Sequence, residues 1–254
     1  DNTWTDHSAT WNTDNYLHSP EYTKALVDDM VRAAIENDIY VIIDFHEHYA
    51  EHWVDLAKDF FTYFATKWGD YPNVMYEIFN EPKCDDGTVV QYAKKIIPTI
   101  RDIDTDNVII VGSSEYSRHP DQVTDAGQGY SNIAYTWHGY IEWGHQSDWN
   151  GKSSWNNGVP VVVTEWGMDP GNTGGLLDKY KQAGVMSAFW SMSNKGGNDA
   201  KWSVLKDDCF KTTGWSESDM TEDGKYTMVC YGAGCISIMA INLTRKSKPV
   251  LYLA

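Results

Sequence analysis

Six short apolar segments, rich in β-branched residues, recur along the chain and predict six strands. Several of them are nearly continuous apolar runs rather than alternating ones, which is typical of strands that are buried on both faces of a sheet. The segments are Ile39–Ile43, Val74–Ile78, Val108–Val111, Ile133–Thr136, Val159–Val163 and Val185–Trp190.

Helical patterns lie between these strands. Ser19 can cap a helix, Pro20 suits its first position, and apolar residues then recur on one face until about Asn37. Trp53–Trp68 is a second amphipathic stretch, and a third carries Val89, Ala93, Ile96, Ile97 and Ile100 at helical spacing. Because strand and helix alternate, we expect a parallel sheet with helices on its faces.

This alternation fits either a doubly wound sheet or an eight-stranded barrel. No glycine-rich phosphate loop follows any predicted strand, which argues against the doubly wound nucleotide-binding folds. We therefore predict an α/β protein with a (β/α)8 TIM barrel over residues 1–215. Residues 216–254 form a tail of unassigned role, with a turn-like Glu222-Asp223-Gly224 and two apolar segments, Cys235–Leu243 and Val250–Leu253.

Composition narrows the classes of ligand. The 254 residues suffice for one domain with a large core. With 20 Lys and Arg against 36 Asp and Glu, the formal charge is -16, which would repel nucleic acid and anionic membranes. The 12 Trp and 16 Tyr exceed what core filling alone needs, and flat rings also stack on sugars. We expect a neutral or cationic substrate, with no nucleic acid and no membrane as partner.

The cysteines and the first residues of the chain say little about the redox compartment of the protein. Cys84, Cys209, Cys230 and Cys235 match neither a zinc pattern nor a dense disulfide framework, and a Cys230–Cys235 bridge stays open. No apolar run approaches the roughly 18 residues of a membrane span. The first residues lack a charged-then-apolar signal, so we expect a soluble chain that is mature or truncated.

Two predicted strands lead into a glutamate. One is followed by Asn80-Glu81-Pro82, and another by Thr164-Glu165-Trp166. Since parallel barrel strands end at one mouth, we expect Glu81 and Glu165 to lie together. Cleavage of a glycosidic bond requires one carboxylic acid and one carboxylate, and a separation of about 5 Å would suit retention of configuration. As the acid, Glu81 would need a pKa raised by low polarity and by the neighbouring carboxylate.

Other polar and aromatic residues end strands at the same mouth. Asn80 cannot ionise and could bond a sugar hydroxyl, Trp190 could form a floor for a pyranose ring, and Lys195 could donate to hydroxyls. His46 and His138 could orient hydroxyls or carboxylates. The nearby His48 and His52 do not complete a His-Glu-x-x-His pattern, so we expect no metal and no cofactor.

On these motifs, residues from about 16 to 215 resemble glycoside hydrolase family 5, and most closely the bacterial endoglucanases of its second subfamily. The resemblance implies that Glu81 is the acid/base and Glu165 the nucleophile. It further implies a set of substrate-binding residues: Asn80 at the 2-hydroxyl, His46 in the glycone site, His138 and Tyr140 as the His-x-Tyr motif with Tyr140 near the nucleophile, Trp190 and Tyr16 as stacking rings, and Lys195 on the glycone side.

The resemblance also implies an activity: retaining double displacement on β-1,4-glucan, without metal, in a secreted enzyme that we expect to be a monomer. One departure matters. The first two βα units of the family, with an arginine that keeps the nucleophile ionised, have no counterpart before Tyr16. We therefore expect a barrel that is incomplete on its N-terminal side, with open edges that the two tail strands could cover.

Two other functions remain open. The same barrel hosts several polysaccharide chemistries, so the chain could be a mannanase or a xylanase. Alternatively, it could be a catalytically inactive fragment that binds glucan through Trp190 and Tyr140.

Overall fold

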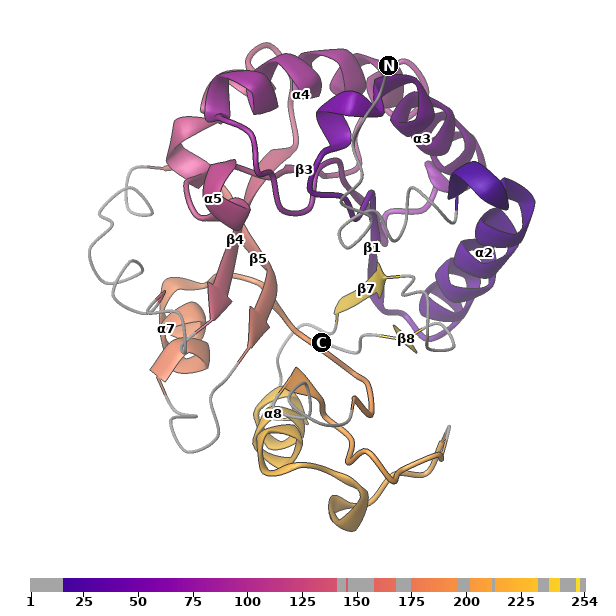
Figure 1. Cartoon of the computed structure of the whole chain (residues 1–254), viewed down its shortest axis with the longest axis vertical. Helices are drawn as coiled ribbons and strands as arrows, with labels where there is room; N and C mark the ends of the chain where they lie inside the picture. The colour runs from indigo at the N-terminus through magenta and orange to yellow at the C-terminus, as the bar shows by residue number, and fades with distance from the viewer. Residues whose placement is uncertain are drawn as a thin grey trace.

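The computed structural model describes residues 16–140, 145, 158–167, 175–195, 202–211, 213–232, 238–242 and 250–251. Its strands lie inside a ring of helices (Figure 1). All six predicted strands are present: β1 Tyr40–Asp44, β2 Val74–Glu77, β3 Ile109–Val111, β4 Ile133–Tyr140, β5 Val161–Gly167 and β6 Ser187–Phe189. Each pairs in parallel with the next, so the expected alternation and the barrel class are confirmed.

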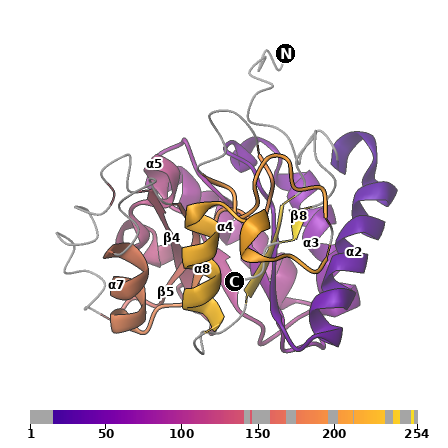
Figure 2. The same cartoon turned by 90° about the horizontal axis from the view of Figure 1, so that it is seen from below.

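Helices cover the outside of the strands, as Figure 2 shows at right angles to the first view. They are α2 Pro20–Glu36, α3 Val54–Trp68, α4 Asp86–Arg101, α5 Ser114–Ser117, α7 Gly175–Ala183 and α8 Glu222–Gly232. Short 3-10 turns occur at η1 Ala50–His52, η2 Pro120–Gln122, η3 Thr124–Gly127 and η7 Glu217–Asp219. None of the described helices combines the length and the apolar character that crossing a membrane would need.

Helix α2 begins at Pro20 as predicted, but the side chain of Ser19 makes no capping bond. Helix α4 is capped by Asp85, whose carboxylate accepts the N–H of Thr88.

The inside of the barrel is filled by one layer of apolar side chains. Each of the six strands contributes one member of this layer: Ile42, Met75, Ile110, Ala134, Val162 and Ala188. A second, larger cluster packs the outer faces of the early strands against α2, α3 and α4. The strands are thus buried on both faces, which is the physical reason for their continuous apolar sequences.

The tail supplies a seventh parallel strand. β7 (Ile238–Asn242) pairs with the edge of β1 that faces away from β2, and β8 (Val250–Leu251) pairs antiparallel with β7. The sheet curls far enough to bring Cα atoms of β6 within 8 Å of β7, although β6 and β7 are not neighbours in the hydrogen-bonded strand order. The expectation that the tail covers an open barrel edge is confirmed at β1.

One prediction for the tail is wrong. Glu222-Asp223-Gly224 is not a turn but the start of α8, which has two acidic residues in its first turn. A side chain at Gly224 would collide with the carbonyl of Val204, so glycine allows the helix to approach this backbone closely. Met220 and Tyr226 pack with Val204 in the same cluster as barrel residues. The division at residue 215 stays a prediction.

Buried polar groups lie between the strands next to the apolar layer. Glu77 of β2 is 2% exposed, and its Oε1 accepts the hydroxyl of Thr164, 2.8 Å away on β5. Thr164 also lies 2.5 Å from the hydroxyl of Thr136 on β4. Burial, with the negative charge of Asp44 as the next cause, raises the pKa of Glu77 to about 7.

A variant at Glu77 tests this burial. Since the pKa of Glu77 is higher in the folded chain than in the unfolded chain, its contribution to stability is present below pH 4 and is lost as the pH rises toward about 7. Between pH 5 and pH 8, titration of Glu77 should lower the free energy of unfolding of the parent by on the order of 3 kcal/mol, and we expect this decrease to be absent in Glu77→Gln. Urea denaturation at both pH values measures it, with the exposed Glu21→Gln as control. Equal pH slopes in the parent and Glu77→Gln would contradict the assignment.

A second prediction concerns the tail strand. Removing residues 233–254 exposes the edge of β1, and an open edge pairs readily with other chains. We expect this truncated chain to form soluble aggregates in light scattering. The control removes only residues 250–254, which takes away β8 but leaves β7 on β1. A monodisperse, folded product of the longer truncation would show that β7 is dispensable.

Candidate active site

The backbone that carries Glu81 is fixed from two sides. After β2, the carbonyl of Ile78 accepts the hydroxyl of Tyr92 on α4 at 2.9 Å. The carbonyl of Asn80 accepts the hydroxyl of Ser117 at 2.6 Å. These bonds satisfy carbonyls that leave the sheet in a buried place, so the turn before Glu81 is held without further strand pairing.

Both carboxylate oxygens of Glu81 have histidine partners. Nδ1 of His138, on β4, lies 2.9 Å from Oε1, and Nε2 of His48, in the segment after β1, lies 3.0 Å from Oε2. The plane of the Glu81 carboxylate is therefore set by two rings, one from β4 and one from the segment after β1.

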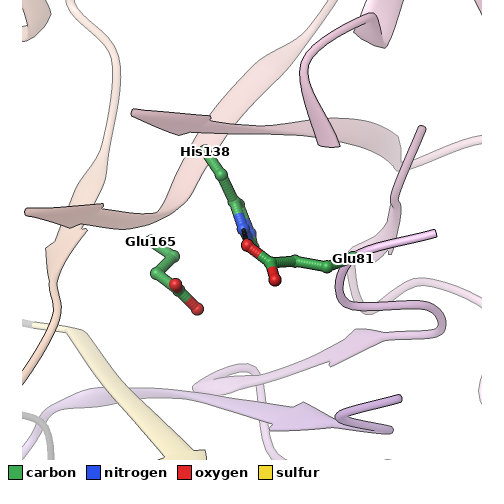
Figure 3. A group of neighbouring side chains, drawn as sticks. All are labelled: Glu81, His138 and Glu165. Carbon is green, nitrogen blue, oxygen red and sulfur yellow. Dashed lines mark hydrogen bonds and ion pairs between the residues drawn. The ribbon is translucent and has the colours of Figure 1, made fainter. Parts of the chain in front are cut away.

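Glu165 lies near the end of β5, next to irregularities in its pairing with both neighbouring strands. The hydroxyl of Tyr140, at the end of β4, donates to Oε1 of Glu165. One oxygen of Glu165, one oxygen of Glu81 and one ring nitrogen of His138 all lie within 4.8 Å of one another. Figure 3 shows the two carboxylates and the ring turned toward a common point. The expected meeting of Glu81 and Glu165 is present.

The carboxyl groups differ in their electrostatic surroundings. Burial by itself would raise the pKa of Glu81, but hydrogen bonds from His138 and His48 outweigh it and hold this pKa below the ordinary value. Burial and the negative charge of Glu81 raise the pKa of Glu165. The expectation of a raised pKa at Glu81 is therefore wrong for the free chain, because sequence showed neither histidine as its direct partner.

His138 connects the glutamates to the barrel interior. Burial would lower the pKa of His138, but the negative charge of Glu165, hydrogen bonding with Glu77 and Glu81, and the negative charge of Glu81 raise it well above its usual range. A protonated ring has two N–H groups. Nδ1 then donates to Glu81, and Nε2 donates to the hydroxyl of Thr164 at 3.0 Å, which in turn donates to Glu77. This chain of donors sets the orientation of the ring.

His46, Trp190 and Lys195 form one group. The ring of His46 stacks on Trp190 with centroids 5.5 Å apart, and Nζ of Lys195 lies 4.4 Å from the Trp190 ring centroid. Nδ1 of His46 lies 2.7 Å from Asp44, and burial lowers the pKa of His46. Their roles toward a sugar stay predictions.

Asn80 and Tyr16 have different surroundings. Asn80 is buried, and its Nδ2 has no hydrogen-bond partner in the described part of the chain. A stacking role for Tyr16 is wrong in this structure: its ring is 2% exposed, packs edge-on against Phe60, and its hydroxyl donates to Asp59 of α3. An aromatic residue just before α2 fills the space between two helices and so leaves no free face for a ligand.

Sequence reasoning missed two residues of this site. His48 was weighed only as one of several neighbouring histidines, and no sequence signal separates it from His52. Glu77 had a signal, because a charged residue inside a continuous apolar strand has to be paired or neutralised.

The closeness of Glu81, His138 and Glu165 also raises the question of a metal ion. Nδ1 of His138 already donates to Glu81, and its Nε2 donates toward Thr164. A ring with both nitrogens protonated has no lone pair for a metal. We therefore interpret the group as two neighbouring carboxyls beside a cationic ring.

The chain is similar in sequence to curated endoglucanases. An endoglucanase of Clostridium saccharobutylicum is 34% identical over 239 residues, which are 87% of this chain and 52% of that protein. Endoglucanase Z of Dickeya dadantii is 37% identical over 215 residues, 83% of this chain and 50% of that protein. The chain spans about half the length of these curated relatives.

Among solved structures, the catalytic domain of Thermobifida fusca endoglucanase Cel5A in complex with cellotetraose superposes with a TM-score of 0.73. It is 24% identical, and the match covers 85% of this chain and 77% of that one. The profile of the cellulase family, glycosyl hydrolase family 5, matches residues 4–196. The match takes in both glutamate motifs and all six predicted strands, and on this ground the chain belongs to glycosyl hydrolase family 5.

Proposed function

We propose that this chain is a retaining endo-β-1,4-glucanase in which Glu81 is the acid/base and Glu165 the nucleophile. The observation that carries the proposal is the approach of the two carboxylates within 4.8 Å at one barrel mouth. Retaining glycosidases have carboxyl groups about 5 Å apart, whereas inverting enzymes need roughly 6.5 to 9.5 Å to admit a water.

In the first step, an oxygen of Glu165 attacks the anomeric carbon while the bond from this carbon to the glycosidic oxygen breaks. Glu81 gives its proton to the departing oxygen. In the second step, Glu81 takes a proton from water as the water oxygen attacks the same carbon, and the ester bond to Glu165 breaks. The sugar is released with its original configuration, and both glutamates return to their starting states.

In the free chain the pKa of Glu81 is lowered and that of Glu165 is raised, which is the reverse of the order that the first step needs. Two carboxyls this close titrate as a pair. Positive charge develops at the anomeric carbon in the transition state and favours the ionised form of Glu165. The hydroxyl of Tyr140 stabilises the same form. We infer that bound substrate shifts the shared proton toward Glu81.

Several observations support glucan as the substrate. The relatives from Clostridium and Dickeya carry the name endoglucanase, and the Thermobifida domain was solved with cellotetraose. In this chain, Trp190 provides an aromatic ring stacked on His46, and Asn80 provides a buried amide nitrogen with no hydrogen-bond partner among the described residues. A polymer too large to enter a cell also favours an extracellular place of action, and we propose a secreted monomer.

The nucleophile is tested by Glu165→Gln. We expect reducing-sugar release from carboxymethylcellulose to fall to background, because an amide cannot form the glycosyl ester. Glu81→Gln should lower the rate by about 10² to 10⁴. Circular dichroism checks the fold, and the exposed Glu21→Gln is the control. Full activity in a folded Glu165→Gln would refute the assignment, and activity of the parent on mannan or xylan alone would change the substrate.

The configuration of the first product tests the distance between the carboxylates of Glu81 and Glu165. We expect proton NMR of cellotetraose hydrolysis to show the β-anomer as the first product, before mutarotation, because two displacements restore the configuration. An α-anomer at early times would mean inversion, and the close approach of the carboxylates would then need another explanation.

A further inference from the structure

Hydrogen bonds hold the backbone of His48 in place beside Glu81. The buried carboxylate of Glu47 accepts the backbone N–H groups of His48 and Tyr49, at 2.8 and 3.0 Å. The carbonyl of His48 accepts the N–H of Lys83 at 3.2 Å, which ties this segment to the residues directly after Glu81. The ring is therefore fixed at its backbone by both neighbouring segments.

Among the described residues, the ring of His48 has one polar partner, Glu81. Its Nε2 lies 3.0 Å from Oε2 of Glu81, and Tyr116 meets the ring edge-on at 5.8 Å. Its Nδ1 is buried and has no hydrogen-bond partner in the described part of the chain. His138 differs here, because Thr164 occupies its second nitrogen.

This difference matters for a glutamate that changes state twice in each turnover. The Nε2–H of the His48 ring donates to Oε2 of the ionised Glu81, and it can keep donating to this oxygen when Glu81 is protonated, because a carboxylic acid keeps acceptor lone pairs. Nδ1, which has no hydrogen-bond partner among the described residues, does not tie the ring to another group. His138 can only donate to Glu81 while both of its nitrogens are protonated.

We propose that His48 is a positioning residue for the acid/base glutamate, and that its ring holds the carboxyl plane of Glu81 in both the ionised and the protonated state. This inference rests on the proposed function. It assigns to His48 no transfer of a proton: the proton that leaves Glu81 goes to the glycosidic oxygen, and the ring keeps its own proton on Nε2.

Other charged groups also surround Glu81, and their effects on Glu81 have to be distinguished from the effect of His48. They are His138 from β4 and Glu165 from β5, with Asp44 and His46 at the end of β1 acting through space. None of these groups occupies Oε2, so the loss of the His48 ring removes a contact that they do not replace in the present arrangement.

The test compares two substrates that differ in their need for an acid. Cellotetraose needs protonation of its leaving oxygen, whereas 2,4-dinitrophenyl β-cellobioside has a leaving group that departs without it. We expect His48→Ala to lower kcat/KM for cellotetraose about 10-fold or more, the size expected for a hydrogen bond to a charged group. For the dinitrophenyl substrate, kcat/KM should change by less than about twofold.

Two variants complete the series. His48→Gln, whose amide can donate or accept, should recover part of the rate on cellotetraose. His52→Ala is the control, because His52 lies on the same segment and pairs with Glu51. Circular dichroism checks that each variant is folded. Equal losses on both substrates would assign His48 a purely structural role, and no loss on either would remove it from the mechanism.

A readout without turnover separates this inference from the proposed function. If the parent hydrolyses neither substrate, the proposed function fails, and the carboxyl carbon of Glu81 can still be titrated by NMR. Since the bond from His48 lowers the pKa of Glu81, His48→Ala should raise that pKa and His52→Ala should not. An unchanged pKa of Glu81 in His48→Ala would overturn the inference.

Discussion

The register of the parallel strands is the constraint on which the rest of the structure depends. Each of the six central strands places one apolar side chain in a common inner layer, and the backbone pairs Val41 with Val74 and Ile42 with Met75. A shift by one residue would turn every inward side chain outward. The same register places Glu77 of β2 beside Thr164 of β5, and it brings Glu81 and Glu165 to one end of the barrel. Packing therefore sets the geometry on which the chemistry relies.

The polar groups above the apolar layer act as one electrostatic unit. Glu77, Thr164, His138 and Glu81 form a continuous series of hydrogen bonds across three strands. Removing any member leaves a buried donor or acceptor unsatisfied, which costs more than the bond itself contributes. The protonated His138 between three carboxyl groups explains how so many acidic side chains fit in a small buried volume.

Much of the fold and part of the site could be predicted from the sequence. Continuous β-branched runs are produced by burial on both faces, so β1 to β6 were visible, and both glutamates followed from their places after strands. The sequence did not show which side chain each carboxylate oxygen contacts. His46 and His48 are two residues apart, yet His46 contacts Asp44 and His48 contacts Glu81. The predictions of a stacking Tyr16 and of a turn at Gly224 were wrong for a related reason. The packing of Tyr16 between helices and the close approach of Gly224 to Val204 depend on residues that are distant in sequence.

The pairing of β7 with β1 has a consequence for how the barrel forms. Ile42 and Ala240 are partners in this ladder and are roughly 200 residues apart along the chain. Contacts of such long range close a large loop and form slowly. During synthesis, β1 emerges roughly 200 residues before its neighbour β7. While these residues are made, at about 5 to 20 residues per second, the edge of β1 that later pairs with β7 has no β7 to bind. Over that interval, the nascent chain depends on its α-helical cover or on chaperones to keep this edge from other chains.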